Sequence, residues 1–394
     1  MQHIKDAKRR SARRRNQWIR IAAIAAAILL LILVIFLLRA LLGRIAGLFD
    51  HTGEETQQVE ETITEEPAVD TSSIQIHNFT LSTGEEEAED TPVEITMSFM
   101  GDYTLGKDSN AAESTSFNSY FETYGPDYFL QNVRSILSAD DLSVINLEGT
   151  LTTSTERKDK KFAFKGDPSY VEVLTGSSIE AANLANNHSH DYYDESYNDT
   201  IDTLDQADIA AFGYDNAAMI EVKGVRVGLA GVNCIEEESI DPNEQTVQTI
   251  TALQEAGAEI IVSFFHWGIE QEYTANETQR ELAHLAIDTG ADLVIGHHPH
   301  VLQGIEEYKG KYIAYSLGNF CFGGNSNPED TDTCILQETF TVNPDGTVDA
   351  DEYPNIIPCA LTSSSGKNDY CPTPLTGEDA ERVLDKMEES ELGT

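Results

Sequence analysis

Carboxylate, amide and imidazole side chains occur in short clusters along the chain, each close after a run of residues with strong β-propensity. The acidic and amide members are Asp102, Glu148, Asn187 and Asp191, and the histidines are His188, His266, His298 and His300. Six of the ten histidines of the chain fall in three of these clusters. Asp and Asn are common in turns, so one cluster alone would carry little information. Together, the clusters offer the mixed oxygen and nitrogen ligands that suit two close divalent ions such as Mn²⁺, Fe²⁺ or Zn²⁺.

The pattern around the clusters predicts one α/β domain over residues 93–375. Its β-rich runs cover residues 95–100, 142–146, 179–184, 226–232, 260–265, 293–295 and 312–316. Helical patterns intervene, as in residues 278–289, where Leu282, Leu285 and Ala286 share one face. In open α/β sheets the loops that follow the strands meet at one edge, so we expect the clustered side chains to converge there.

The order of the clusters resembles that of the calcineurin-like metallophosphoesterases. In detail it is similar to that of the bacterial capsule-synthesis protein CapA family, the poly-γ-glutamate capsule or PgsA-like proteins. The motifs that carry the resemblance are Gly101-Asp102, Asn146-Leu147-Glu148, Asn186-Asn187-His188 with Asp191, His266-Trp267-Gly268 with Glu270, Gly296-His297-His298-Pro299-His300 and Ser316-Leu317-Gly318-Asn319-Phe320. The resemblance implies a four-layer αββα metallophosphatase-like sandwich. It also implies a part in making, exporting or anchoring a capsular polymer of the poly-γ-glutamate type.

The resemblance further implies a role for each matching residue. The implied metal ligands are Asp102 on a first ion, Glu148 bridging both ions, Asn187 and His266 on the second, and His298 and His300 with one on each. His188 is implied as the proton donor to a leaving oxygen, with Asp191 orienting its ring.

Two departures from the phosphoesterase pattern leave two hypotheses open. Thr104 stands where a second ligand, normally His, follows the first Asp, and the bridging acid is Glu148 within Asn-Leu-Glu. The intact histidine motifs favour a dinuclear metal hydrolase. The Thr104 departure favours a non-catalytic assembly subunit that binds nascent polymer or capsule-synthase subunits.

A basic segment directly follows the Asn-Leu-Glu motif. Its five residues are Arg157, Lys158, Lys160, Lys161 and Lys165. One interpretation is a solvated hairpin. The other is an anion-binding lip for a polyanionic polymer or phosphate, because a positive segment in an acidic domain concentrates such ligands. On this second interpretation Lys158, Lys160, Lys161 and Lys165, with Asn319, are the predicted substrate contacts.

The N-terminal segment predicts a single membrane anchor. Residues 21–38 are 18 consecutive apolar residues, and a helix over 18–42 would cross most of a hydrocarbon core about 30 Å thick. Seven Lys and Arg residues lie within positions 1–17, which predicts a cytoplasmic N-terminus and an extracellular C-terminal domain. The alternative is a cleaved signal peptide, but its apolar region would span about 7–15 residues before a small-residue cleavage site.

The charge of the remaining chain excludes some partners. Residues 1–44 hold ten basic residues and one acid of the chain's 25 and 68, so the remainder carries 15 basic and 67 acidic residues, or about −52. Such a field repels nucleic acid, so we predict no nucleic-acid partner. The acidic stretch 43–92 predicts a disordered linker, in which the apolar patch at 74–81 could add an edge strand to the domain.

The C-terminal region gives two smaller predictions. Residues 376–394 are predicted to form a terminal helix with Val383, Leu384 and Met387 on its apolar side. All five cysteines follow the anchor, on the side where disulfides persist. Their spacing favours the pairs Cys321–Cys334 and Cys359–Cys371 but leaves other pairings open.

Overall fold

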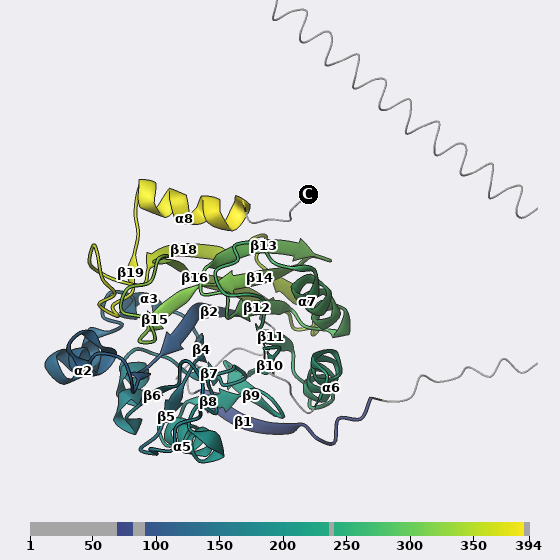
Figure 1. Ribbon diagram of the computed structural model, residues 1–394. Coiled ribbons are helices and arrows are strands. Elements are labelled where there is room, and N and C mark those ends of the chain that lie inside the picture. The colour runs from purple at the N-terminus through teal and green to yellow at the C-terminus, as the bar shows by residue number, and fades with distance from the viewer. Residues whose placement is uncertain (1–68, 82–90, 236–239, 390–394) are drawn as a thin grey trace, which may run out of the picture. The chain divides into compact units, whose positions relative to one another are not determined.

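Two β-sheets lie face to face in the computed structural model of the chain (Figure 1), which describes residues 69–81, 91–235 and 240–389. The first sheet has the strand order β1-β9-β10-β11-β12-β14-β13. Its strands are β1 (Gln75–Leu81), β9 (Asn216–Val222), β10 (Val225–Asn233), β11 (Ile260–His266), β12 (Leu293–His297), β14 (Lys311–Leu317) and β13 (Leu302–Tyr308).

The second sheet has the strand order β19-β18-β16-β2-β4-β7-β8, with β15 beside β2 and β17 beside β16. Its strands are β19 (Thr373–Pro374), β18 (Asn355–Ala360), β16 (Asp332–Val342), β2 (Val93–Thr104), β4 (Leu142–Leu147), β7 (Ala181–Asn183), β8 (Ala210–Phe212), β15 (Asn319–Phe322) and β17 (Val348–Ala350). A small third sheet joins β3 (Lys107–Asp108), β6 (Phe164–Gly166) and β5 (Thr150–Leu151).

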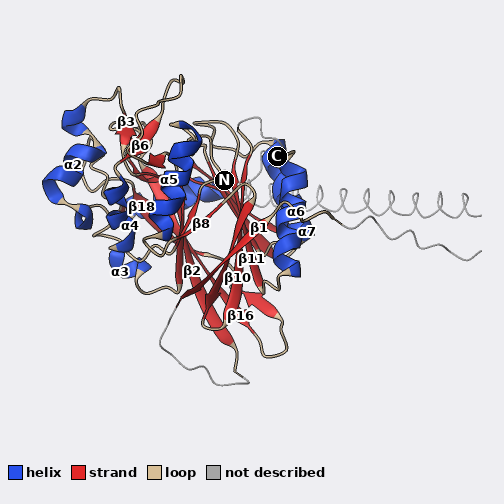
Figure 2. Cartoon of the chain, turned by 90° about the horizontal axis from the view of Figure 1, so that it is seen from below, coloured by secondary structure: helices blue, strands red, loops and turns tan. Residues whose placement is uncertain are grey.

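Helices cover the outer face of each sheet (Figure 2). Leu253 of α6 (Pro242–Glu255) and Leu282 of α7 (Glu277–Thr289) lie in one apolar cluster with strands of the first sheet. Over the second sheet lie α2 (Phe117–Tyr124), α3 (Arg134–Leu137), α4 (Glu172–Thr175) and α5 (Tyr193–Asp205). A third cluster, which includes Phe99, Val144 and Phe264, fills the space between the sheets. The predicted mixed α/β fold is therefore confirmed, with layers in the order helix, sheet, sheet, helix.

Parallel pairing aligns the ends of the central strands. In the second sheet β2, β4, β7 and β8 run parallel, and in the first sheet β10, β11, β12 and β14 do so. The sequence of β11, IIVSFFH, is almost entirely apolar before its final histidine, as expected for a parallel strand covered on both faces. The polar residues that follow each run are therefore delivered to the same edge of the sandwich.

The C-terminal helix α8 (Glu378–Glu389) closes the core between the two sheets. Val383 and Met387 are buried in the cluster between the sheets, whereas Leu384 is exposed. Arg382 bonds the carboxylate of Asp332 at 2.9 Å, and Lys386 bonds the same carboxylate at 2.8 Å. The predicted helix is confirmed, with two of its three apolar residues against the core.

Strand β1 is the edge strand that the apolar patch at 74–81 was expected to add to the domain. Strand β1 pairs in parallel with β9 through its whole length, so the apolar patch at 74–81 belongs to the first sheet and the described domain begins before residue 93. The predicted segments 1–17 and 18–42, and most of the predicted linker, lie outside the described residues. Among the described residues, no helix has the length and apolar character needed to cross a bilayer.

The favoured disulfides are not formed. All five cysteines, which lie in the described part of the chain, are free thiols. Cys334 belongs to the cluster between the sheets, whereas Cys321 belongs to the cluster under the outer helices. Close spacing in the sequence therefore does not bring these two side chains to the same face of the sheet.

Candidate metal centre

Two rows of polar side chains face each other where the parallel strands end. In the second sheet Asp102 pairs in register with Asn146, and in the first sheet His266 pairs with His297. Asn146 Nδ2 donates to Asp102 Oδ1 over 2.9 Å and lies 3.3 Å from His266 Nδ1. His297 Nδ1 donates to the same Asp102 oxygen over 3.1 Å. The convergence expected from the strand ends is therefore present between the two sheets.

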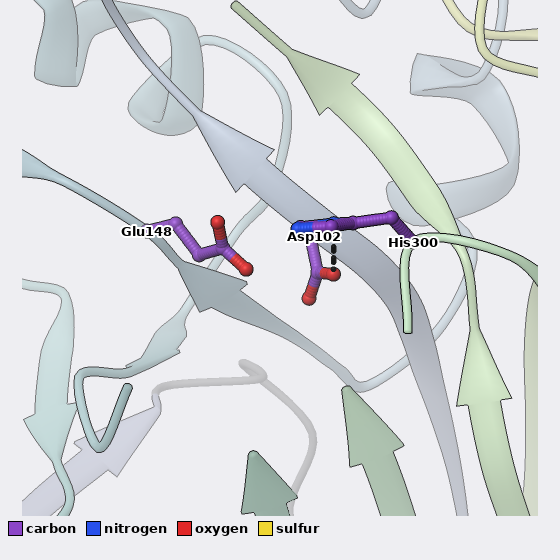
Figure 3. Close-up of side chains that lie close together, drawn as sticks. All are labelled: Asp102, Glu148 and His300. Carbon is purple, nitrogen blue, oxygen red and sulfur yellow. Dashed lines mark ion pairs between the residues drawn. The ribbon is translucent and has the colours of Figure 1, made fainter. Parts of the chain in front are cut away.

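Asp102, Glu148 and His300 form the centre of this arrangement (Figure 3). One ligand atom from each of the three lies within 4.8 Å of the others. His300 Nδ1 is 3.1 Å from Asp102 Oδ2 and 2.9 Å from Asn319 Oδ1. Both carboxylate oxygens of Glu148 are buried without a hydrogen-bond partner among the described residues. Such a carboxylate is costly to bury unless a ligand completes its coordination.

The protonation of this centre reflects its burial and its charges. Burial raises the pKa of Asp102, but hydrogen bonds from His297 and His300 outweigh it and hold that pKa well below its usual range. Burial, and then the charge of Asp102, raise the pKa of Glu148 well above its usual range. Burial lowers the pKa of His300, but Glu148 and Asp102 outweigh it and raise that pKa to about 9. The centre therefore holds a proton that a cation would replace.

A second group of ligand atoms adjoins Glu148. His266 Nε2 is 2.9 Å from Asn187 Oδ1 and 3.6 Å from Glu148 Oε1. The rings of His266 and His298 lie 4.8 Å apart, and His298 Nδ1 is buried without a hydrogen-bond partner among the described residues. Burial, followed by the charges of neighbouring histidines, lowers the pKa of His266 and brings that of His298 to about 4. Both rings are therefore neutral near pH 7, as metal-ligating imidazoles must be.

The loop that carries two of the histidines has a strained backbone. His298 and His300 have φ values of 95° and 58°, a region that residues other than glycine seldom adopt. Such strain is typical of positions whose side-chain direction matters for function. A neighbouring loop approaches closely, because the Asp102 N–H donates to the Gly318 carbonyl over 2.8 Å and a Cβ on Gly101 would lie 2.1 Å from that oxygen. This contact places Asn319 beside His300.

His188 lies next to the centre and is held by Asp191. His188 Nδ1 donates to Asp191 Oδ2 over 2.8 Å, which leaves Nε2 for a ligand. Asp191 is fully buried, and its other oxygen accepts from Lys160 Nζ over 2.8 Å. Lys160 also donates to the Asn187 carbonyl over 2.6 Å. His188, Asp191 and Lys160 thus form a chain of hydrogen bonds that fixes the loop carrying Asn187.

Of the other basic residues, Arg157, Lys158 and Lys161 lie in the loop between β5 and β6, which we call the basic loop, and Lys165 lies in β6. Arg157 forms an ion pair with Asp108 at 2.8 Å, and Lys165 bonds the Ser154 carbonyl. Lys158 lies over the ring of Tyr193, and Lys161 lies over the ring of Phe162. Whether Lys158, Lys160, Lys161, Lys165 and Asn319 contact a substrate stays a prediction.

All six predicted ligands, with His188 and Asp191, lie in this one region, and two residues without an assigned role, Asn146 and His297, lie among them. Asn146 accepts at Oδ1 from Asn183 Nδ2 over 2.9 Å while its own amide contacts Asp102. His297 contacts Asp102, although it directly precedes a predicted ligand. Polar residues directly at strand ends were the available signal. Thr104, at the departure from the phosphoesterase pattern, has a buried hydroxyl without a hydrogen-bond partner among the described residues.

These side chains fit a divalent metal. The two oxygens of Glu148 lack hydrogen bonds within the described part of the chain, the imidazoles of His266 and His298 are neutral, and an amide oxygen of Asn187 lies beside them. This donor set has the mixed oxygen and nitrogen character of first-row transition-metal sites.

Comparison with known proteins places the chain in a family. The family described as "Bacterial capsule synthesis protein PGA_cap" matches residues 96–324. The PGA biosynthesis protein CapA of Bacillus subtilis is 32% identical over 58% of this chain and 63% of that protein. The capsule biosynthesis protein CapA of Bacillus anthracis is 29% identical over 70% of this chain and 71% of that protein. Among solved structures, TT1561 of Thermus thermophilus is similar at a TM-score of 0.39 and 12% identity, covering 66% of this chain and 99% of that chain. Because the family match spans more than half of its length, the chain belongs to the bacterial capsule synthesis protein family PGA_cap.

Proposed function

We propose that this protein acts in the biosynthesis, export or anchoring of a capsular polymer of the poly-γ-glutamate type, through a site that binds divalent metal. The family match supports the process, and the similar CapA proteins of two Bacillus species bear names of that process. The observation that carries the metal site is the convergence of Asp102, Glu148 and His300 within 4.8 Å, with both Glu148 oxygens lacking hydrogen bonds among the described residues. The proposal includes metallophosphatase-like chemistry at this site.

We propose that the two adjoining groups of residues would hold two ions of Mn, Fe or Zn. Asp102 and His300 would bind the first ion. The second ion would be bound by Asn187, His266 and His298, and Glu148 would bind both ions. Bound metal would act as a Lewis acid on an ester or phosphoryl oxygen. Within this chain, Asn146 and His297 fix the Asp102 carboxylate, and Asp191 fixes the tautomer of His188 so that Nε2 faces a ligand.

The location of the protein is part of the proposal. A helix over residues 18–42 would anchor the chain in the cell membrane, and the basic segment 1–17 would keep the N-terminus in the cytoplasm. Protease added to intact cells should then remove the domain from residue 93 onward and leave a membrane-embedded stub. Full protection of the domain in cells with an intact membrane would refute this topology.

Metal content tests the site directly. The full-length chain, loaded with Mn²⁺, Fe²⁺ or Zn²⁺ in turn and desalted, should retain about two ions per chain by elemental analysis. The double variant H298A/H300A should lose them. The variant H284A is the matched control, because His284 lies on α7 and bonds Glu306 outside the site. Equal metal content in the double variant and the control would refute the site.

A second candidate function is hydrolysis of a phosphoester on a cell-surface substrate. The observation that favours it is the bond of 2.8 Å between His188 and Asp191, since a general acid next to a metal site is typical of hydrolases. The metal-loaded chain should then hydrolyse bis-p-nitrophenyl phosphate, and H188A should keep its metal and lose at least about 100-fold in rate. A metal-loaded wild type without turnover would favour the non-catalytic assembly subunit.

A further inference from the structure

A pocket of about 570 Å³ opens beside the metal centre, and His188 and His300 line it. Three phenylalanines line it too. The ring of Phe164 lies 4.5 Å from that of His188, and the ring of Phe322 lies 5.1 Å from that of His300. Phe162 is 47% exposed and is stacked at an interplanar angle of 10° on Phe164. His188, the proposed proton donor, and His300, a proposed metal ligand, therefore lie against the three phenylalanine rings, which we call the aromatic wall and which reach the surface at Phe162.

The polar lining of the pocket consists of amides and carboxylates. Its side-chain amides belong to Gln271, Asn319, Asn325 and Asn327, and its carboxylates belong to Glu270, Glu329 and Asp330. Asp330 is paired with Lys386 at 2.5 Å and accepts from the Tyr273 hydroxyl. Glu270 and Glu329 have no ion-pair or hydrogen-bond partner among the described residues. Within the described part of the chain, no Lys or Arg lines the pocket.

This lining disfavours a polyanion inside the pocket. A chain with a carboxylate on every residue would meet Glu270 and Glu329 in a domain that is itself strongly acidic, and no Lys or Arg of the described residues lines the pocket to offset them. Lys161 Nζ lies 4.7 Å from the centre of the Phe162 ring, at the edge of the aromatic wall, but Lys161 is not part of the lining. The basic loop and the pocket therefore offer different chemistry.

The same lining matches the two kinds of surface on a pyranose ring. The C–H face of a sugar stacks on an aromatic ring, whereas its hydroxyls bond amide and carboxylate groups that both donate and accept. Unpaired carboxylates at the mouth also attract an amine. We propose that this pocket binds a neutral or amine-bearing glycan next to the metal centre, stacked on Phe162 and bonded by the amides and carboxylates of the lining. This inference names a substrate class for the proposed site and so rests on the proposed function.

Binding of defined oligomers to the full-length chain tests the proposal. The probes are N-acetylchitotetraose, its deacetylated amine form and a γ-glutamate oligomer of similar length, titrated by calorimetry with and without Mn²⁺. We expect both sugars to bind and the γ-glutamate oligomer not to displace them. F162A should weaken both sugars by about threefold to tenfold, the range of one aromatic stacking contact. E329Q should weaken the amine form alone.

The matched control is Y124A, which removes another exposed aromatic ring, on α2 and outside the pocket. Affinity for both sugars should stay unchanged in that variant. The proposal is overturned if neither sugar binds, if F162A binds as tightly as Y124A, or if the γ-glutamate oligomer competes and gains affinity in E329Q. Elemental analysis of F162A distinguishes a failure of the glycan proposal from a failure of the metal site, because the F162A substitution should leave the metal content unchanged.

Discussion

Carboxylates lie at both ends of the second sheet, half-buried at the amino ends of its parallel strands and buried at the carboxyl ends, and the two sets are bonded differently. At the amino ends of its parallel strands, Asp141 Oδ2 accepts from the Thr96 N–H over 3.0 Å, and Glu180 Oε2 accepts from the Ser143 N–H over 2.8 Å. At the carboxyl ends, neither oxygen of Glu148 has a hydrogen-bond partner among the described residues. A carboxylate that caps a neighbouring strand stabilises the fold, whereas one without a partner destabilises it until a ligand binds.

A further buried carboxylate, that of Glu338, shows that a missing hydrogen-bond partner alone does not mark a ligand site. Glu338 of β16 is buried, and both of its oxygens lack a hydrogen-bond partner among the described residues. Glu338 is not part of the metal-ligand group formed by Asp102, Glu148 and His300. What distinguishes the carboxyl end of the sheet is therefore the convergence of several ligand types on one unbonded carboxylate.

The largest expected effect comes from replacing Glu148. The variant E148Q should lose the metal-induced rise in the free energy of unfolding, which reaches about 4 kcal/mol for wild type at 1,000 times the dissociation constant. Without metal, E148Q should be more stable than wild type, because a neutral amide is less costly to bury than a carboxylate without partners. Thermal unfolding with and without Mn²⁺ measures both effects. The control is E180Q, which should keep the full response to metal, and an equal response in E148Q and E180Q would contradict the comparison.

The second-largest expected effect is a difference between two neighbouring lysines, Lys160 and Lys161, in their contribution to the free energy of unfolding. K160M should lower the free energy of unfolding by about 2–3 kcal/mol, because it leaves the buried Asp191 without its cation. K161M should change it by less than about 0.5 kcal/mol, because Lys161 is exposed and its side chain lies over the Phe162 ring. Urea unfolding of the two variants is the measurement. Equal losses would show that Lys160 does not hold the loop of Asn187 and His188.

The sequence alone predicts the strands and the grouping of the ligand residues, but it does not predict which contacts individual residues make within that group. Apolar runs and the polar residues that end them were enough to predict the seven strand positions and to group Asp102, Glu148 and the histidines. The role of His297 was not predictable, because only strand register decides that its Nδ1 reaches Asp102 while its neighbour His298 reaches His266. The contacts of Lys160 were equally hidden, since they depend on how the loop between β5 and β6 folds back onto Asp191.

The third effect is a pH dependence of the free energy of unfolding that we expect from Glu338. Burial, and then the charge of Asp351, raise the pKa of Glu338 from 4.5 to about 8. The folded protein therefore keeps a proton that the unfolded chain releases, so the contribution of this residue is full below pH 4.5 and is lost as pH rises toward 8. E338Q should match wild type at pH 4 and become increasingly more stable than wild type as pH rises to 8. Thermal unfolding across this range, with unchanged metal content, is the measurement, and a pH-independent difference would contradict the assignment.

The smallest effect concerns the two lysines of the basic loop that bond no acid in the described structure, Lys158 and Lys161. If the outer surface of this loop binds a polyanion while the pocket binds a glycan, K158Q/K161Q should weaken binding of poly-γ-glutamate by about threefold to tenfold at low salt. The loss should shrink as salt rises, because exposed charges are screened within about 10 Å at 0.1 M salt. Metal content and sugar binding should stay unchanged, since neither lysine lines the pocket. K309Q/K367Q is the control, because it removes two exposed lysines outside the basic loop. Equal losses in the two double variants would indicate a general charge effect, whereas a loss confined to K158Q/K161Q would assign polymer binding to the basic loop.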